Sequence, residues 1–339
     1  MHQKNEIFSI AVIIPCYKVN KHILNVISGI GIEVSRIYVV DDNCPEQVGS
    51  FVKKFCFDSR VTVITNNKNV GVGGSVKIGY VAATDDGANV IVKIDGDGQM
   101  DPLLVKKIIA PIIAGEADYT KGNRFFDLEE IGKMPTVRLL GNAVLSFITK
   151  LSSGYWDIFD PTNGYTAIHS DIVKYLPLDK ISNRYFFESD MLFRLNVMRA
   201  VVVDVPIAAK YADEESNMFI SNIIFEFLVK HTRNFIKRIF YNYYLRDMSI
   251  ASIELPIGVI LVLSGGLFGV NRWLASFNTG VSVTAGTVML AALPVLLGVQ
   301  LILAFLGYDI ATVPRRPRQL KLNDKVVKFR TIEPKEHCD

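Results

Sequence analysis

The chain contains 339 residues, of which 50% are hydrophobic, and its formal net charge is +3. This length corresponds to one or two domains. The mean hydropathy of +0.27 is high for a purely soluble protein. The small net charge gives no reason to expect nucleic-acid binding, because such binding depends on many cationic contacts to phosphates.

The cysteines and the first residues indicate the compartment in which the chain works. The cysteines form neither a CxxC pair nor a zinc pattern, and they stand at Cys16, Cys44, Cys56 and Cys338. We therefore expect reduced thiols that face the cytosol. Residues 1–6 are polar, and the apolar run 7–14 is short and ends at Pro15, which does not match a signal peptide.

The first half of the chain alternates apolar strands with helices. The expected strands cover residues 8–14, 36–40, 61–65 and 89–94, and the expected helices cover residues 21–28, 45–55 and about 75–83. This alternation predicts a parallel sheet with right-handed crossovers. Such a sheet is typical of nucleotide-binding α/β domains.

The fourth strand leads into the most informative stretch, residues 93–102, read Lys-Ile-Asp-Gly-Asp-Gly-Gln-Met-Asp-Pro. Asp95 and Asp97 are separated by a single glycine, and the adjacent glycines leave room for both carboxylates to approach one point. Two carboxylates on a rigid strand end suit Mg²⁺ or Mn²⁺, with Gln99 as a further polar contact. The final Asp-Pro pair predicts a helix start. A plain strand-to-helix turn is the alternative, because Asp-Gly pairs are common in turns.

The glycine-rich stretch after the third strand raises the alternative of a dinucleotide-binding oxidoreductase. Gly71 and Gly73 begin a G-x-G-x-x-G-like pattern, but Val76 stands where the third glycine is needed. The stretch also follows the third strand instead of the first, and the chain contains no Walker A pattern. These departures disfavour hydride transfer.

The remainder of this half is less regular and carries further polar residues. We expect strands at 117–125, within 160–168 and at 201–205, and helices at 137–151 and from 186 to about 198. Arg124 lies near the end of the first of these strands, Arg138 and Asn142 lie on the first helix, and Glu188 lies at the start of the second.

Two long apolar runs, residues 250–270 and 287–307, dominate the C-terminal part. Each has about the 20 residues that a bilayer-spanning helix needs, and a buried core helix is the alternative. Before them, residues 216–248 predict a basic amphipathic helix in the headgroup region, although its first half also suits packing on the preceding domain. Basic residues flank the two runs, whereas Arg272 is the only cation in residues 271–284 between them. The positive-inside rule therefore predicts two spans with both flanks in the cytoplasm.

Taken together, these motifs resemble glycosyltransferase family 2, and within it the polyprenyl-phosphate glycosyltransferases of the dolichyl-phosphate mannose synthase type. The matching stretches are Ile14-Pro-Cys-Tyr17, Val39-Val-Asp-Asp42, Asn67-Lys-Asn-Val-Gly71, Asp95–Pro102, Gly122-Asn-Arg-Phe125, Asn163-Gly-Tyr165 and Phe187-Glu188. The chain departs from the family pattern at Lys18-Val19, where Asn-Glu is usual, at Asn43-Cys-Pro45, where small or hydroxyl residues are usual, and at Asn142, where Ser is usual.

The resemblance implies a Rossmann-like GT-A domain that transfers a sugar, with inversion, from a UDP- or GDP-sugar to a polyprenyl phosphate. The product would be a lipid-linked sugar for glycan or glycolipid assembly. The implied donor contacts come from Pro15, Tyr17, Asp41, Asp42, Asn67, Gly71, Asp95 and Gly96. For Asp41 and Asp42, a role as turn caps is the alternative.

The resemblance also assigns the metal and the acceptor. Mg²⁺ or Mn²⁺ would be held by Asp97 together with Asp95 and Gln99. The acceptor phosphate would be received by Arg124, Arg138 and Asn142. The alternative is that both arginines are surface residues paired with acids such as Asp127, Glu129 or Glu130. Glu188 sits where family members with hydroxyl acceptors place a base, and here a structural or hydroxyl-positioning role is its alternative.

The expected organisation is a catalytic domain at 1–215, interfacial amphipathic helices at 216–248, a two-helix transmembrane region at 249–310 and a basic cytoplasmic tail at 311–339. We expect a multi-pass protein of the inner or plasma membrane with its catalytic domain in the cytoplasm. Its partners would be a nucleotide sugar, a polyprenyl phosphate lipid and the membrane, with no nucleic acid. A homo-oligomer stays open.

Two other functions are alternatives to this expectation. A processive polysaccharide synthase of the same family would carry a Gln-x-x-Arg-Trp motif, which precedes neither Trp156 nor Trp273, and more spanning helices. A non-catalytic membrane subunit with a degenerate sugar-nucleotide fold is the alternative from another class. The intact acids and arginines argue against it.

Overall fold

The computed structural model describes residues 8–126, 136–207 and 220–320, with side chains for 8–126, 139–207 and 225–320. The described residues divide into two compact units. The first unit contains the residues up to Phe235 together with 314–320, and the second contains Ile236–Val313.

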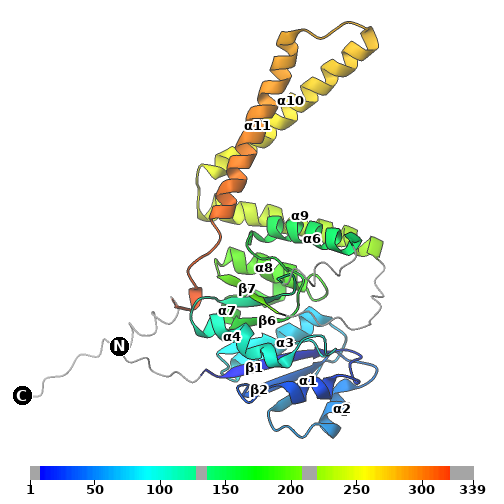
Figure 1. Cartoon of the computed structure of the whole chain (residues 1–339), viewed down its shortest axis with the longest axis vertical. Coiled ribbons are helices and arrows are strands. Elements are labelled where there is room, and N and C mark those ends of the chain that lie inside the picture. Colours follow the sequence, from blue (N-terminus) through cyan, green and yellow to red (C-terminus); the bar gives the residue numbers. More distant parts are fainter. Residues whose placement is uncertain (1–7, 127–135, 208–219, 321–339) are drawn as a thin grey trace, which may run out of the picture. The chain divides into compact units, whose positions relative to one another are not determined.

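The first unit is built on one seven-stranded sheet in the order β3-β2-β1-β4-β6-β5-β7. Figure 1 labels four of its strands, β1, β2, β6 and β7. The strands are β1 (Ile10–Cys16), β2 (Arg36–Asp41), β3 (Val61–Thr65), β4 (Val90–Lys93), β5 (Tyr119–Asn123), β6 (Thr166–His169) and β7 (Val202–Pro206). The helices are α1 (Ile23–Gly29), α2 (Val48–Phe55), α3 (Val72–Asp85), η1 (Pro102–Leu104), α4 (Val105–Ile113), α6 (Thr136–Ser153), α7 (Ser170–Tyr175), η2 (Leu178–Lys180), α8 (Phe187–Val197) and the first part of α9 (Ile220–Phe240).

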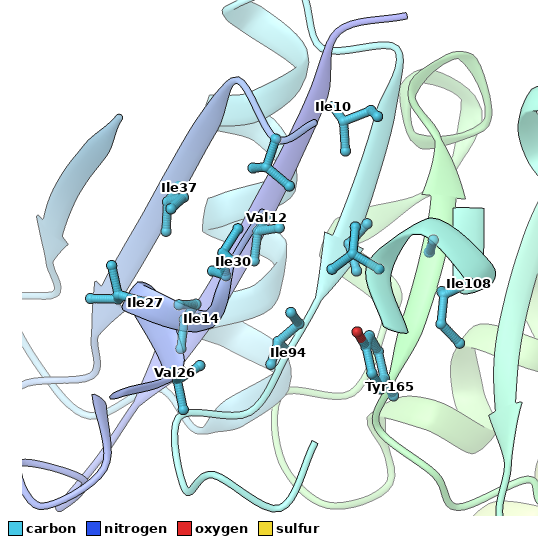
Figure 2. Packing of buried hydrophobic residues seen from close by; sticks show 14 of the residues in the cluster. Ile10, Val12, Ile14, Val26, Ile27, Ile30, Ile37, Ile94, Ile108 and Tyr165 are labelled. Carbon is cyan, nitrogen blue, oxygen red and sulfur yellow. The ribbon is translucent and has the colours of Figure 1, made fainter. Parts of the chain in front are cut away.

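All seven residues of the central strand β1 are buried, because helices cover both of its faces. On one face, alternate residues of β1 join a cluster with α1, as Figure 2 shows for Ile10, Val12, Ile14, Val26, Ile27 and Ile30. On the other face, α3 approaches so closely that a Cβ at Gly79 would lie 2.5 Å from Cγ2 of Ile13. A central strand covered on both sides reads as a continuous apolar run. This is why the sequence pattern located β1.

The parallel arrangement predicted for the first four strands is confirmed, and the second half of the sheet adds one antiparallel strand. β1, β2, β3 and β4 are parallel to one another, and so are β5 and β7, but β6 runs antiparallel to both β4 and β5. β6 is four residues long and all four are buried. A short, fully buried strand has no alternation of exposed and buried residues, so its direction depends on tertiary packing.

The chain returns to the first unit after its second long helix. The backbone N–H groups of Arg318 and Gln319 both donate to the carboxylate of Asp118, each at 2.8 Å. The side-chain amide of Gln319, which is 4% exposed, donates to the carbonyl oxygens of Ile112 and Ala117 at 3.0 and 2.6 Å. These bonds fasten the segment 314–320 to β5 and α4.

The second unit contains the last part of α9, a π-helical turn (Tyr241–Arg246), and the long helices α10 (Ala251–Thr279) and α11 (Ala285–Ala311) (Figure 1). α10 and α11 pack as an antiparallel pair in which small residues allow backbone contact. A Cβ at Gly258 would lie 2.9 Å from the carbonyl oxygen of Gly298, and one at Gly265 would lie 2.8 Å from that of Ala291. Close packing through small residues is characteristic of helices in lipid.

Both long helices have the length and composition to cross a membrane. They contain 29 and 27 residues, and only 11% of the most apolar window of each is buried within the protein. A core helix of a soluble domain would be mostly buried, so this exposure disfavours the alternative of buried core helices.

A buried ion pair joins α9 to the last turns of α11. Arg238 donates to Asp309 at 2.6 Å, and the Tyr243 hydroxyl donates to the same carboxylate at 2.5 Å.

Candidate active site

The two acids of the central motif lie at the carboxyl end of β4, and their side chains are half-buried. Oδ1 of Asp97 accepts the backbone N–H of Gln99 at 2.9 Å, which closes a tight turn. Gly98 in this turn has φ +80°, a conformation that side chains disfavour. Asp101 then caps the helix start, since its carboxylate accepts the N–H of Leu103 at 3.1 Å. The motif therefore joins a strand to a helix, and it places both carboxylates beyond the carboxyl ends of the parallel strands.

A buried lysine lies directly behind these acids. Nζ of Lys93 is 3.0 Å from Oδ1 of Asp95 and 3.2 Å from Oε1 of Glu188. Burial alone would lower the pKa of Lys93, but the charges of Asp95 and Glu188 outweigh it and hold that pKa above its ordinary value. The lysine is therefore a fixed cation that joins the motif to the first turn of α8.

The carboxylate oxygen atoms of Asp95 and Asp97 are suitable ligands for a hard divalent cation. Gly96 between them sits close to the end of β1, since a Cβ there would lie 3.4 Å from Sγ of Cys16. Within the described residues, no group of three or more His, Cys, Asp or Glu side chains could hold a metal by itself. Mg²⁺ commonly takes one or two carboxylates and completes its shell with water and substrate phosphates. The role of Gln99 as a ligand stays a prediction.

The residues predicted to contact the donor lie at the same edge, because β1, β2 and β4 are parallel and end together. β1 ends at Pro15–Cys16, and the following Tyr17 is 46% exposed. The Asn67 to Gly71 loop follows β3, the next strand of the sheet. The placement is compatible with donor binding, which stays a prediction for these residues.

Asp41 and Asp42 are both 3% exposed and bind nearby loops. Asp41 accepts the N–H groups of Cys44 and Gly49 at 2.8 and 2.7 Å. Asp42 accepts the N–H groups of Val70 and Gly71, each at 2.8 Å. Asp41 therefore closes its own turn, as in the alternative role, whereas Asp42 fastens the end of β2 to the loop before α3. A contact of either residue with the donor stays a prediction.

The predicted acceptor residues lie directly after β5 and on α6. Arg124 binds Asp160 through two hydrogen bonds, Nε to Oδ2 at 2.8 Å and Nη2 to Oδ1 at 3.1 Å. Asp160 is fully buried, whereas the Arg124 side chain is 33% exposed. Arg138 lies in the first turn of α6, and its side chain is outside the described part of the chain. Asn142 lines a cavity of about 250 Å³ with aromatic neighbours that include Phe125, Phe147 and Phe159.

Two further ionisable side chains lie on this acceptor side, the buried Lys121 and the half-buried Asp204. Burial lowers the pKa of Lys121 to about 8, and its Nζ donates to the carbonyl oxygen of Asn163. Burial raises the pKa of Asp204 to about 6, and its Oδ2 accepts the N–H of Phe159 at 2.7 Å. Lys93, Asp160 and Lys121 were not predicted as site residues. A charge at the end of an apolar strand was the available signal for Lys93, whereas nothing local marked Lys121 in its polar strand, or Asp160.

Comparisons with known proteins identify the family of this site. The sequence profile of Glycosyl transferase family 2 matches residues 11–176. A UDP-N-acetylglucosamine–dolichyl-phosphate N-acetylglucosaminyltransferase from Methanococcus voltae is 30% identical over 218 residues, which cover 60% of this chain and 86% of the relative. The chain belongs to glycosyltransferase family 2. Within this family, an undecaprenyl-phosphate mannosyltransferase from Micrococcus luteus is 27% identical to this chain. The alignment covers 59% of this chain and 82% of that relative. The relatives support the prediction of a polyprenyl-phosphate glycosyltransferase.

A solved structure confirms the GT-A type of the fold. Glucosyl-3-phosphoglycerate synthase from Mycobacterium tuberculosis, crystallised with Mn²⁺, UDP and phosphoglyceric acid, aligns with a TM-score of 0.51 and 16% identity. The alignment covers 68% of this chain and 78% of that protein. At this identity the likeness establishes the architecture of the family 2 domain.

Proposed function

We propose that this family 2 glycosyltransferase moves a sugar, with inversion, from a UDP- or GDP-sugar to a polyprenyl phosphate. The observation that carries the proposal is the placement of Asp95 and Asp97 at the carboxyl edge of the sheet, where α/β domains bind nucleotides. Relatives named for transfer to dolichyl or undecaprenyl phosphate support the choice of acceptor.

The proposed mechanism depends on alignment and charge more than on proton transfer. A polyprenyl phosphate is already an anion, so its oxygen can attack the anomeric carbon without a strong base. The C–O bond to the nucleoside diphosphate breaks as the new bond forms on the opposite face. Asp95 and Asp97 would hold Mg²⁺ or Mn²⁺, which supplies positive charge for the leaving diphosphate.

The cationic side chains of the acceptor side would bind the lipid phosphate. An arginine offers a planar fork of donors that matches a phosphate. Asp160 fixes the orientation of Arg124 through two hydrogen bonds, while part of the side chain stays exposed. We propose that Arg124, Arg138 and Asn142 form this site. Glu188 contacts Lys93, which supports a structural role in place of a general base.

Membrane attachment completes the proposal. α10 and α11 are antiparallel, and the chain enters the second unit after Phe235 and returns to the first unit at Pro314. Two crossings therefore leave both flanks on the same side. We propose that these flanks, with the catalytic unit, lie in the cytoplasm, where nucleotide sugars are available.

The direct test is transfer by membranes that contain the full-length protein. Membranes would be incubated with labelled UDP- and GDP-sugars and polyprenyl phosphate, and label in an acid-labile lipid would be measured. Transfer that depends on the lipid phosphate supports the proposal. Label in a polymer indicates a processive synthase. No transfer with any donor indicates a non-catalytic subunit.

Arginine substitutions test the acceptor site. Arg138→Ala should raise KM for polyprenyl phosphate about tenfold or more, the loss expected for one charge-assisted contact. Arg138→Lys should recover only part of this loss. KM for the nucleotide sugar should stay near the wild-type value. An effect confined to the donor would contradict the assignment.

A further inference from the structure

Lys93 occupies a position that a sheet interior rarely gives to a lysine. It is the last residue of β4, its side chain is 1% exposed, and it pairs with Ile13 of β1 and Thr166 of β6. The residues before it on β4 are all buried and apolar. Lysines are almost never buried to this extent unless the charge is paired. The partners of Lys93 therefore matter to its role.

Its two partners come from different elements of the fold. Asp95 follows β4, and Glu188 lies in the first turn of α8, yet both carboxylates lie within 3.2 Å of Nζ of Lys93. The side chains of Asp95 and Glu188 keep exposed fractions of 28% and 13%. The ammonium group is thus enclosed, while each carboxylate reaches the surface on its outer side.

The loop before β6 closes over this ion group with backbone alone. A Cβ at Gly164 would lie 2.5 Å from Nζ of Lys93 and 2.7 Å from Oδ2 of Asp95. The same loop carries Asp160, the partner of Arg124. Lys93 consequently lies where the donor side and the acceptor side of the site meet.

We propose that Lys93 is a positioning residue of the donor site, which joins Asp95 and Glu188 into one unit and sets the orientation of Asp95. Without the shared ammonium, two neighbouring carboxylates would repel each other and adopt other rotamers. A partner behind a metal ligand fixes the geometry of that ligand. The proposal rests on the proposed function, because it assigns Asp95 to the cation of the donor.

Two roles of Lys93 predict opposite effects on cation binding. If Lys93 acted only as a positive charge, its removal would strengthen the attraction of the site for a divalent cation. If Lys93 orients Asp95, its removal weakens cation binding although the site becomes more negative. Binding of Mn²⁺ alone therefore separates the two roles without any substrate.

The test uses the full-length protein in detergent, with free Mn²⁺ measured by electron paramagnetic resonance. Lys93→Met keeps the length of the side chain and removes the charge. We expect its Mn²⁺ dissociation constant to rise about tenfold or more, the usual effect of losing a partner of a metal ligand. In transfer assays of this variant, the fold-decrease in kcat should exceed the fold-change in KM for the lipid phosphate.

Arg238→Met is the matched control. Arg238 is a buried arginine of the second unit, 1% exposed, and its carboxylate partner is Asp309. The Mn²⁺ affinity of this variant should equal that of the wild type. A loss of similar size in both variants would indicate a general effect of removing a buried, paired cation, and would overturn the proposal.

Gly164→Ala provides a second variant that keeps every charge. Its methyl group would push against Lys93 and Asp95, so Mn²⁺ binding should weaken as in Lys93→Met, and this variant decides the question if Lys93→Met does not fold. Unchanged Mn²⁺ affinity in the folded variants, or tighter binding in Lys93→Met, would overturn the role of Lys93. A wild type that binds Mn²⁺ but transfers no sugar would instead overturn the proposed function.

Discussion

Asp97 and Asp95 differ in their surroundings although they are two residues apart. Asp95 contacts a buried cation, whereas Asp97 closes a surface turn through the N–H of Gln99. Asp97 can therefore lose its charge with less effect on the core than Asp95.

Asp97→Asn is expected to abolish most activity while the fold survives. The amide keeps the size of the side chain and an oxygen that can accept the N–H of Gln99. Transfer should fall about 100- to 1,000-fold, as when one electrostatic contact to a transition state is removed. Initial rates and circular dichroism would be compared with the wild type. Normal turnover in this variant, or in wild type with excess chelator, would rule out the metal role.

Asp204 is predicted to make stability depend on pH. Burial raises its pKa from 3.8 to about 6, so the folded protein binds this proton more tightly than the unfolded chain. Its contribution to stability is present at low pH and is lost as the pH rises from about 4 to about 6. Asp204→Asn should therefore increase the free energy of unfolding at pH 7.5 by about 1–3 kcal/mol.

The same substitution should give little or no gain at pH 4, because the wild-type carboxyl group is then largely protonated in the folded protein. Asparagine keeps an oxygen for the N–H of Phe159. Thermal melting at both pH values measures the difference. An equal gain at both would show that the charge of Asp204 is not the cause.

At the scale of elements, α9 is fastened to α6 and α8 by polar contacts beneath an apolar surface. Oγ of Ser152 and Nδ1 of His231 are 2.7 Å apart, and Asn234 donates to Asp190 at 3.0 Å. The His231 ring also packs against Phe186, with centroids 4.8 Å apart. Burial lowers the pKa of His231 from 6.5 to about 4.

Acidification should therefore loosen α9. The unfolded chain binds a proton at His231 between about pH 6.5 and 4 and the folded protein does not, so stability is lost as the pH falls through this range. The loss should reach at most about 3 kcal/mol. His231→Asn should melt with a weaker dependence on pH in this range, and an unchanged dependence would refute the role of His231.

At the scale of the whole molecule, the charges that flank the apolar helices predict the orientation in the membrane. Arg272 is the only cation in residues 271–284, whereas Arg315, Arg316 and Arg318 follow the second helix. A cysteine at Asn278, close to the end of α10, should react with an impermeant maleimide added to intact cells. Labelling only after permeabilisation would contradict the predicted topology. Lys174→Cys is the cytoplasmic control, because the Lys174 side chain is exposed, whereas the nearby Ser170 is buried.

The sequence by itself determined the local elements and the motif at the end of β4. Continuous apolar runs located β1, β2 and β4, and the Asp-Pro pair located the start of the next helix, because these signals arise between near neighbours in the chain. The two long apolar helices were predicted for the same reason. The resemblance to glycosyltransferase family 2 added the roles of residues, which composition and spacing could not supply.

Only the tertiary structure decided which distant residues share a site. Glu188 contacts Lys93 across 95 residues, Asp160 binds Arg124 across 36, and residues 318 and 319 return to Asp118 across about 200. The antiparallel direction of β6 was also decided there. Such pairings leave no periodic signal, because they depend on how the packed sheet brings strand ends and loops together. The local pattern could therefore mark the acids, while the charges that hold them became visible only in the fold.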